Sequence, residues 1–319
     1  MSQPILRVRN LRVVFPHRHG ELVAIDDISF DVNKGEILGF VGESGAGKSM
    51  TGAAIIGLID PPGDSESGEI WLDDKRIDEL DSGAMTRIRG DRISMVFQDP
   101  LTSLNPLRTI GDQLVETIQT HLPIGDDEAK RKAMAGLEEV GIDPSRFDAY
   151  PHEFSGGMRQ RVVIALALSA EPELIIADEP TTALDVSVQA QVLKLLRKLC
   201  QEHGASVILI THDMGVIAET TDRVAVLYAG RLAEIGPTAE VLNEPQHPYS
   251  RGLIASTPSV EQGNIDTRLF QISGAMPRLD ELPAGCAFNP RCEHRMERCA
   301  DERPELLQDR VSCWLYADG

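Results

Sequence analysis

The sequence has no surplus of positive charge, no long apolar run and few cysteines. Its 31 Lys and Arg stand against 50 Asp and Glu, which gives a net charge of −19 at pH 7. A nucleic-acid-binding protein needs a basic surface to neutralise phosphates, so this composition argues against that class. It favours solubility and weakly disfavours binding to an anionic membrane surface.

The sequence also shows neither the apolar run expected of a membrane-spanning helix nor the pattern expected of a signal peptide. No apolar run reaches the ~18–20 residues that cross a bilayer, and residues 1–7 lack the form of a signal peptide. We therefore expect a cytosolic location, where disulfides are disfavoured. Among the five cysteines, Cys200 stands alone at the end of a helical pattern and is most simply a packed thiol. The others lie between residues 286 and 313.

The most informative stretch is Gly-Glu-Ser-Gly-Ala-Gly-Lys-Ser at residues 42–49, which fits the phosphate-loop pattern G-x-x-x-x-G-K-[ST]. Apolar residues 37–41 before it predict a buried strand, and residues 48–59 predict a helix. In that context the loop N–H groups and the helix N-terminus form an anion site. Lys48 would reach the β- and γ-phosphates of a nucleoside triphosphate, and Ser49 would bind Mg²⁺. The alternative, an accidental glycine-rich turn, does not require the flanking strand and helix.

A second motif, Leu-Ile-Ile-Ala-Asp-Glu-Pro at residues 174–180, ends an apolar strand with two acids. Asp178 suits a carboxylate aimed at Mg²⁺ beside the phosphate loop. Glu179 would be displaced towards the γ-phosphate and could polarise an attacking water. The alternative is a strand ended by two solvated acids, which is less favoured in a chain that also has a phosphate loop.

A third motif, Ser-Gly-Gly-Met-Arg-Gln at residues 155–160, opens a predicted helix. Ser155 is a good N-cap, and Gly156 and Gly157 would allow close approach to an anion. The alternative is a plain helix start, which would not need two adjacent glycines.

Strands and helices alternate along most of the chain, which predicts an α/β fold. Residues 5–15 and 22–32 alternate apolar and polar and predict an N-terminal antiparallel β region. Residues 111–121 and 127–140 have helical spacing and predict a helical insert. Apolar runs separated by helical segments predict a P-loop NTPase core, a mixed and mostly parallel sheet with helices on both faces. These runs are 174–177, 207–210 and 224–227.

The pattern changes near residue 236, where proline becomes frequent and the alternation ends. We therefore predict a nucleotide-binding domain over residues 1–235, with a helical subdomain over about 99–160. Residues 236–319 would form a second domain, a small Cys-rich C-terminal extension.

Five elements in a fixed order resemble the nucleotide-binding subunits of ATP-binding cassette (ABC) transporters. The resemblance covers residues 5–235, and "ALD" at 183–185 resembles the D-loop of that family. The five elements are the phosphate loop at 42–49, Gln98 in "VFQDP", the signature "FSGGMRQR" at 154–161, the acidic strand ending in "ADEP", and His212 in "ITHD".

The resemblance implies a mechanism in which two subunits stack head to tail and bury two ATP molecules. Each ATP would lie between one phosphate loop and the signature of the other subunit. Glu179 would be the general base, His212 would contact the γ-phosphate, and Gln98 would sense Mg²⁺. Phe15 matches the aromatic residue that stacks on adenine, although a core Phe is an equally good interpretation. The residues expected to contact nucleotide or Mg²⁺ are Phe15, Gly42, Glu43, Ser44, Gly45, Ala46, Gly47, Lys48, Ser49, Met50, Gln98, Ser155, Gly156, Gly157, Asp178 and Asp185.

Three stretches resemble one branch of the family, the oligopeptide/dipeptide (peptide/nickel-type) importers. Phe154 and Met158 replace the ends of the common Leu-Ser-Gly-Gly-Gln signature, as is typical of that branch. "VFQDPLTSLNPL" at 96–107 and "HPYSRGLIASTP" at 247–258 are also similar to it.

The four late cysteines, Cys286, Cys292, Cys299 and Cys313, have gaps of five, six and thirteen residues. Disulfides conflict with the cytosol, and structural zinc sites usually have closer pairs. The resemblance implies a [4Fe–4S] cluster, because some members of this branch carry one on cysteines spaced in this way. Zinc or free thiols are the alternatives, and His294 among the cysteines is more simply a surface residue.

The resemblance implies an ATPase subunit that drives import of peptides or a related small solute. Its partners would be two membrane permease subunits, a second ATPase subunit (a copy or a related chain) and an extracytoplasmic substrate-binding protein. It would be peripheral, on the cytoplasmic face of the membrane, and would bind no nucleic acid. The alternatives are a soluble cassette ATPase acting in translation or repair and a nucleotide-gated regulator without turnover.

Overall fold

The structure, a computed structural model, describes residues 3–18, 20–182, 184–257 and 271–317. The chain forms two compact units, each built from separate chain segments. The first unit comprises Met1–Leu6, Val32–Ile37 and Trp71–Ile210; the second comprises Arg7–Asp31, Leu38–Ile70 and Thr211–Gly319. The domain boundary predicted near residue 236 stays a prediction.

The first unit contains three parallel strands and the helices that precede and connect them. Strands β8, β7 and β6 are neighbours in that order and pair in parallel, with Ile93 opposite Leu174 and Leu174 opposite Ser206. Every residue of β7 and β8 is buried, as expected for continuous apolar strands covered on both faces. The elements are β5 Lys75–Arg76, α2 Ser82–Ile88, β6 Ile93–Val96, α3 Pro100–Ser103, α4 Ile110–His121, α5 Asp126–Glu139, α6 Gly156–Leu168, β7 Leu174–Asp178, α7 Val186–His203 and β8 Ser206–Ile210, with 3₁₀ turns at Pro144–Arg146 and Pro151–Glu153.

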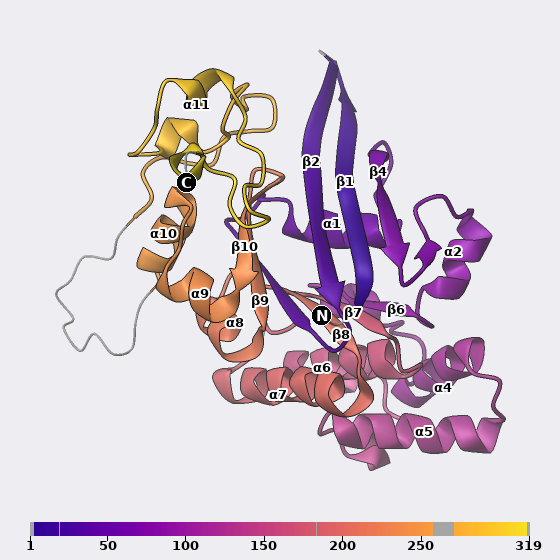
Figure 1. The fold of residues 1–319 in the computed structure, drawn as a ribbon. Helices are drawn as coiled ribbons and strands as arrows, with labels where there is room; N and C mark the ends of the chain where they lie inside the picture. Colours follow the sequence, from indigo (N-terminus) through magenta and orange to yellow (C-terminus); the bar gives the residue numbers. More distant parts are fainter. Residues whose placement is uncertain (1–2, 19, 183, 258–270, 318–319) are drawn as a thin grey trace, which may run out of the picture. The chain divides into compact units, whose positions relative to one another are not determined.

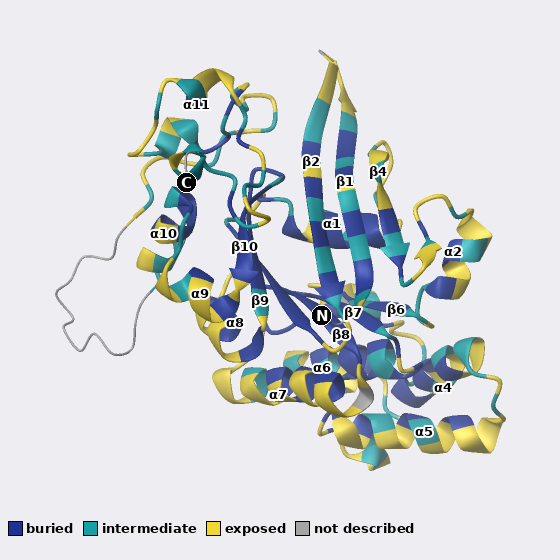
Figure 2. Ribbon diagram, viewed as in Figure 1, coloured by how far each residue is buried: buried dark blue, intermediate teal, exposed yellow. Residues whose placement is uncertain are grey.

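Helices α4, α5 and α6 pack against one another, and α4 and α5 lie side by side in Figure 1. The side chain of Thr109 caps α4 by accepting a hydrogen bond from the N–H of Asp112 at 3.1 Å. Leu114 and Ile118 of α4 and Leu137 of α5 are buried, and the other faces of these helices are mostly exposed (Figure 2). The helical insert predicted from apolar spacing is therefore present, with bounds within one residue of those expected.

The second unit contains a long β hairpin, the phosphate-loop segment and everything after β8. In Figure 1 strands β1 and β2 run beside each other, and β1 is the neighbour of both β2 and β4. The elements are β1 Pro4–His17, β2 Gly20–Asn33, β3 Ile37–Val41, α1 Lys48–Ile55, β4 Asp64–Leu72, α8 Met214–Thr220, β9 Arg223–Tyr228, β10 Arg231–Pro237, α9 Thr238–Asn243, α10 Pro248–Ala255 and α11 Arg298–Asp301, with 3₁₀ turns at Asn289–Arg291 and Trp314–Tyr316.

Strand β9 pairs with two strands of the second unit, β3 and β10. It runs parallel to β3, with Leu38 opposite Arg223, and antiparallel to β10, with Tyr228 opposite Arg231. Together with the two parallel pairs of the first unit, these pairings agree with the predicted mixed, mostly parallel architecture. Strands β9 and β10 are almost entirely buried, while burial alternates along β1 and β2 (Figure 2).

The core of the second unit includes residues from the C-terminal part of the chain. Val41 of β3 and Tyr228 of β9 share one buried cluster with Tyr249 of α10 and with Phe288. The rings of Tyr228 and Tyr249 lie 4.6 Å apart, and those of Tyr228 and Phe288 lie 5.2 Å apart, both edge to face. The segment after β10 is thus packed onto the strand that leads into the phosphate loop.

Two local features differ from the expectation. Helix α1 ends at Ile55 rather than near residue 59, because Gly57 takes the left-handed conformation (φ 62°) and its N–H donates to the carbonyl of Ala54. Strand β10 was not predicted, since its apolar run is interrupted by Glu234. Among the described residues, no helix is both long enough and apolar enough to cross a membrane.

Candidate functional site

The loop between β3 and α1 has the backbone geometry of a phosphate loop. The φ angles of Gly42, Gly45 and Gly47 are 151°, 81° and 102°. Residues other than glycine rarely adopt such positive values. A Cβ at Gly42 would lie 2.3 Å from the carbonyl oxygen of Leu227, so glycine is required there. Gly47 is the N-cap of α1 and provides no side-chain acceptor for the first turn. The N-terminal N–H groups of α1 are thus suited to an anionic ligand.

Lys48 is buried against this loop, with 6 % of its surface exposed. Its ammonium donates to the carbonyl oxygens of Gly42 at 2.8 Å and Glu43 at 3.1 Å. The cation therefore lies over the loop, where a phosphate group would be bound. Its predicted contact with the β- and γ-phosphates stays a prediction.

His212 belongs to the same compact unit as the phosphate loop. It is exposed and directly follows Thr211, whose N–H donates to the carbonyl of Phe40 in β3 at 3.2 Å. The next residue, Asp213, caps α8 by accepting from the N–H groups of Gly215 and Val216. His212 thus follows a segment bonded to the strand that leads into the loop.

Phe15 is half-buried near the end of β1 in this unit. Its ring packs against Gly63, where an added Cβ would lie 2.4 Å from the ring. This packing is compatible with both interpretations of Phe15, so its contact with adenine stays a prediction.

The acidic residues lie in the first unit, at the end of β7. Asp178 is the last residue of this strand and is 5 % exposed. Glu179 follows in the left-handed region, with φ of 47°. Its carboxylate oxygen Oε2 accepts hydrogen bonds from Nε2 of Gln98 at 3.1 Å and from Oγ1 of Thr182 at 2.7 Å. The structure therefore brings together Gln98 and Glu179, which the motifs had placed in one site.

Thr182 is a residue that the sequence analysis missed. A hydroxyl three residues after an acid can turn back onto its carboxylate when the chain bends sharply between them. The bend here follows from the left-handed backbone of Glu179, and the pair of threonines after Pro180 was the available signal.

The signature motif begins α6 as predicted. The hydroxyl of Ser155 caps the helix by accepting from the N–H of Met158 at 3.3 Å. Ser155 and Gly156 are exposed, whereas Phe154 is buried and lies under the guanidinium of Arg146. The start of α6 is therefore exposed, whereas Phe154, just before it, packs into the protein.

Asp185 caps α7 by accepting from the N–H of Val188 at 2.9 Å. This contact gives Asp185 a structural role, and any contact with nucleotide stays a prediction. Ala183 of the predicted D-loop and residue 258 of the "HPY" stretch lie outside the described residues.

The four late cysteines line one small pocket in the second unit, together with Trp314. Burial raises the pKa of Cys286 to about 11 and also raises the pKa of Cys292 and Cys313, so these thiols are protonated at neutral pH. The N–H of Cys286 donates to the carbonyl of Cys299 at 2.9 Å. Within the part of the chain that the structure describes, no group of three or more His, Cys, Asp or Glu is arranged to hold a metal ion.

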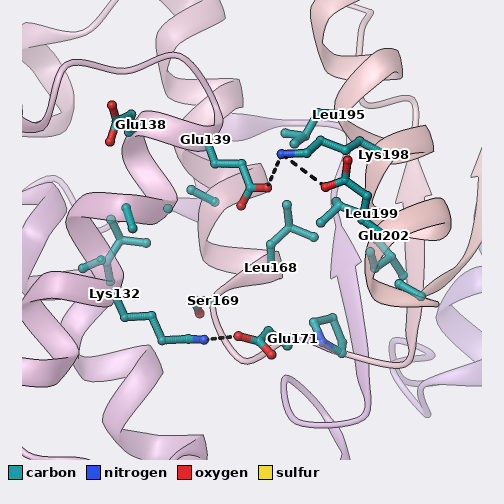
Figure 3. A pocket seen from close by; sticks show the side chains of 18 of the residues that line it. Lys132, Glu138, Glu139, Leu168, Ser169, Glu171, Leu195, Lys198, Leu199 and Glu202 are labelled. Atoms are coloured by element: carbon teal, nitrogen blue, oxygen red, sulfur yellow. Dashed lines mark hydrogen bonds and ion pairs between the residues drawn. The ribbon is translucent and has the colours of Figure 1, made fainter.

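A groove of about 1100 Å³ lies between helices of the first unit (Figure 3). Leu168 and Leu195 lie in its wall, Lys132 pairs with Glu171, and Lys198 lies 3.5 Å from Glu139. None of the described residues that line it belongs to the predicted nucleotide site. Cys200, predicted as a packed thiol, is buried in this unit.

Comparisons with known proteins agree with these motifs. The ABC transporter family matches residues 25–182, and the oligopeptide/dipeptide transporter C-terminal region matches residues 233–299. The chain is 44 % identical over 321 residues to the oligopeptide transport ATP-binding protein AppD of Bacillus subtilis, covering 98 % of this chain and 97 % of that protein. It is 46 % identical over 321 residues to the dipeptide transport ATP-binding protein DppD of the same organism, covering 98 % and 95 %.

A solved structure is also similar to this chain. It is a dimeric ATP-binding cassette in a post-hydrolysis state bound to ADP and phosphate. The TM-score is 0.67 at 28 % sequence identity, and the match covers 73 % of this chain and 98 % of the other.

Proposed function

This chain belongs to the ABC transporter family as the ATP-hydrolysing subunit of a peptide importer, and we propose which of its residues bind ATP and which hydrolyse it. The loop from Gly42 to Ser49 would bind the triphosphate through backbone N–H groups, and Lys48 would neutralise the β- and γ-phosphates. Asp178 and the hydroxyl of Ser49 are oxygen donors of the kind that Mg²⁺ prefers. A bound Mg²⁺ would neutralise charge that develops on the phosphates.

The carboxylate of Glu179, held by Gln98 and Thr182, is the observation that supports hydrolysis most directly. Two donors on one oxygen fix the orientation of this carboxylate at the end of a buried strand. Glu179 would take a proton from water as the water oxygen bonds to the γ-phosphorus and the bond to the ADP oxygen breaks. His212 would donate a hydrogen bond to the γ-phosphate.

Replacing Glu179 with Gln tests this assignment. The amide keeps the shape of the side chain but cannot accept the proton, so turnover should fall ~10²–10⁴-fold while ATP affinity is kept. Glu128→Gln, an exposed acid at the start of α5, is the control and should leave both unchanged. Turnover of Glu179→Gln within a few-fold of wild type would remove Glu179 from the role of base.

The family and the dimeric cassette reported above support a proposal for the assembly. Two ATPase subunits would stack head to tail, so that the signature of one, from Ser155 to Gly157, meets nucleotide held by the other. The partner would be a copy of this chain or a related one. Two membrane permeases and an extracytoplasmic binding protein would complete an importer of peptides or related small solutes, with this subunit on the cytoplasmic face. The C-terminal match and the peptide-transport relatives favour this over a translation or repair ATPase.

We also propose that Cys286, Cys292, Cys299 and Cys313 bind a [4Fe–4S] cluster as thiolates. Their shared pocket supports this proposal, whereas their raised pKa values and their present arrangement do not. Binding of iron would require the four thiols to lose their protons and to move closer together. The role of the cluster would be structural or regulatory, because the cysteines lie outside the motifs of the nucleotide site.

Protein purified without oxygen should then be brown, with absorbance near ~400 nm and about four iron atoms per chain. Cys299→Ser should bleach the colour and leave ATP binding intact, while Cys200→Ser should keep the colour. Colourless protein that holds one zinc would exclude the cluster but keep a metal site. Anaerobic protein with neither metal would exclude both.

A further inference from the structure

Three side chains from the segment after β10 contact the phosphate loop, and motif analysis predicted none of them for this role. The hydroxyl of Tyr249 accepts a hydrogen bond from the N–H of Glu43 at 2.8 Å. Arg291 donates from Nη1 and Nη2 to the two carboxylate oxygens of Glu43, at 2.9 and 3.0 Å. Met276 lies against Gly45, where an added Cβ would be 2.9 Å from its methyl carbon. All these residues belong to the second compact unit.

The pair of Arg291 and Glu43 differs from an ordinary surface ion pair. The side chain of Arg291 is 6 % exposed and that of Glu43 is 28 % exposed. Arg291 is itself held by the carbonyl of Ser273 at 2.9 Å and lies near the rings of Tyr228 and Phe288. A bidentate, pre-positioned and largely buried guanidinium interacts with a carboxylate more strongly than a flexible exposed one.

The charge of Glu43 is the reason that this contact bears on nucleotide binding. Glu43 is the second residue of the loop that would bind a triphosphate, and an unpaired carboxylate there would repel the phosphates. Arg291 neutralises that charge. Tyr249 holds the N–H of the same residue and is fully buried, so the first turn of the loop is fixed at both backbone and side chain.

We propose that Arg291 and Tyr249 are positioning residues of the nucleotide site: they shape the start of the phosphate loop and cancel the charge of Glu43. This inference rests on the proposed role of residues 42–49 in binding ATP. It makes nucleotide affinity depend on the folded C-terminal segment. Arg291 immediately precedes Cys292, so the contact with the loop and the cysteine pocket share one short segment.

Calorimetric titration of the full chain with Mg-ATP, in a Glu179→Gln background that prevents turnover, tests the proposal. Arg291→Gln should raise Kd about five- to tenfold, because it leaves Glu43 charged beside the phosphates. Glu43→Gln alone should change Kd by less than about twofold, because it removes the repelling charge itself. The double variant should return to within about twofold of the parent, since the two residues act as a pair.

Further variants separate positioning from folding. Arg291→Lys keeps the positive charge but cannot bind the carboxylate of Glu43 bidentately. Its affinity for Mg-ATP should therefore lie between those of the parent and Arg291→Gln. Tyr249→Phe should weaken binding and leave the midpoint of urea unfolding nearly unchanged. In chains with native Glu179, Arg291→Gln should raise KM with little change in kcat. Arg310→Gln is the matched control, since Arg310 pairs with Glu240 at 2.8 Å and does not contact the loop.

Each outcome has a distinct meaning. Arg291→Gln with unchanged Kd overturns the proposal, and so does a double variant as weak as Arg291→Gln, because the loss would then be structural. Lys48→Ala is included to test the loop itself and should lose most of the affinity. If Lys48→Ala binds ATP as the parent does, the role of the loop fails, whatever Arg291 does. If only Lys48→Ala is weak, the loop stands and the role of Arg291 fails.

Discussion

Glu179 combines a fixed carboxylate with an unusual backbone conformation. A non-glycine residue at φ 47° is disfavoured, and residues held in this way are common at functional sites. Its N–H is bonded to the carbonyl of Ile210, and its carboxylate is bonded to Gln98 and Thr182. These contacts maintain a conformation that sequence alone would not favour, and they point the acid in one direction.

Thr182→Val should therefore slow turnover without weakening ATP binding. Valine has the shape of threonine but no donor, so the carboxylate of Glu179 loses the hydrogen bond from Thr182. A net contribution of about 1 kcal/mol corresponds to a loss of roughly fivefold in kcat. Steady-state kinetics should show this with KM unchanged. Thr86→Val, which removes an exposed hydroxyl in α2, should behave as wild type. A kcat equal to wild type for Thr182→Val would show that the bond does not matter.

At the scale of elements, the residues that cap helices determine where several helices of this chain begin. Thr109, Ser155 and Asp185 each cap a helix through a side-chain oxygen, and each stands where the sequence places a polar residue before an apolar run. The start of α1 differs from these three, since its cap is Gly47 in the left-handed region and offers no side-chain acceptor; α5 and α9 also lack a side-chain cap. At α1 this leaves the first turn suited to the phosphate that we propose binds there.

The exposed start of α6 leads to a prediction about assembly. Dimers should form only with Mg-ATP and an inactive Glu179→Gln chain, because nucleotide supplies the interface between loop and signature. Adding Ser155→Arg should block these dimers by bulk and leave monomer binding of ATP intact. Light scattering after size exclusion would measure this, with the natural partner ATPase present if the pair is mixed.

Ser155→Ala is the matched control, because it removes the same N-cap, at a cost of about 1 kcal/mol, and adds no bulk. It should keep the dimer that Ser155→Arg loses. Normal dimers of the Ser155→Arg chain would show that the head-to-tail arrangement is wrong.

For the whole molecule, the segment after β10 belongs to the same compact unit as the phosphate loop. Glu234 in β10 accepts hydrogen bonds from the N–H groups of Gln246 and His247, and His247 Nδ1 accepts from the N–H of Tyr249. Burial lowers the pKa of His247 to about 4, so this ring is neutral in the folded protein. The "HPY" stretch thus places Tyr249 against the loop through a buried, uncharged histidine.

This predicts a loss of stability in weak acid. Between pH 6.5 and about 4 the unfolded chain binds a proton at His247 and the folded chain does not, so the free energy of unfolding falls as pH falls. The stabilisation, about 3 kcal/mol from a shift of this size, is complete above pH 6.5. Urea midpoints at pH 7.5 and 5 should show a steeper fall for wild type than for His247→Gln. His294→Gln, at an exposed position, should keep the wild-type slope. Equal slopes for wild type and His247→Gln would contradict this account.

The sequence by itself determined the motifs and most of the elements. The phosphate loop, the acidic strand, the capped signature helix and the two helices of the insert are local patterns, and local patterns depend on residues that are neighbours along the chain. The order of these motifs was sufficient for the fold class and the family. The end of α1 and strand β10 were less predictable, because a left-handed glycine and an internal Glu234 depend on their surroundings.

Only the tertiary structure decided which distant side chains meet. Gln98 and Glu179 are 81 residues apart, and Glu43 and Arg291 are 248 apart. Such pairs depend on which chain segments pack together and on the register of the strands that lead to them, neither of which a local pattern contains. For this reason the sequence could predict the phosphate loop and the proposed base, whereas the contact of Thr182 with Glu179 and that of Arg291 with Glu43 became visible only when the chain was folded.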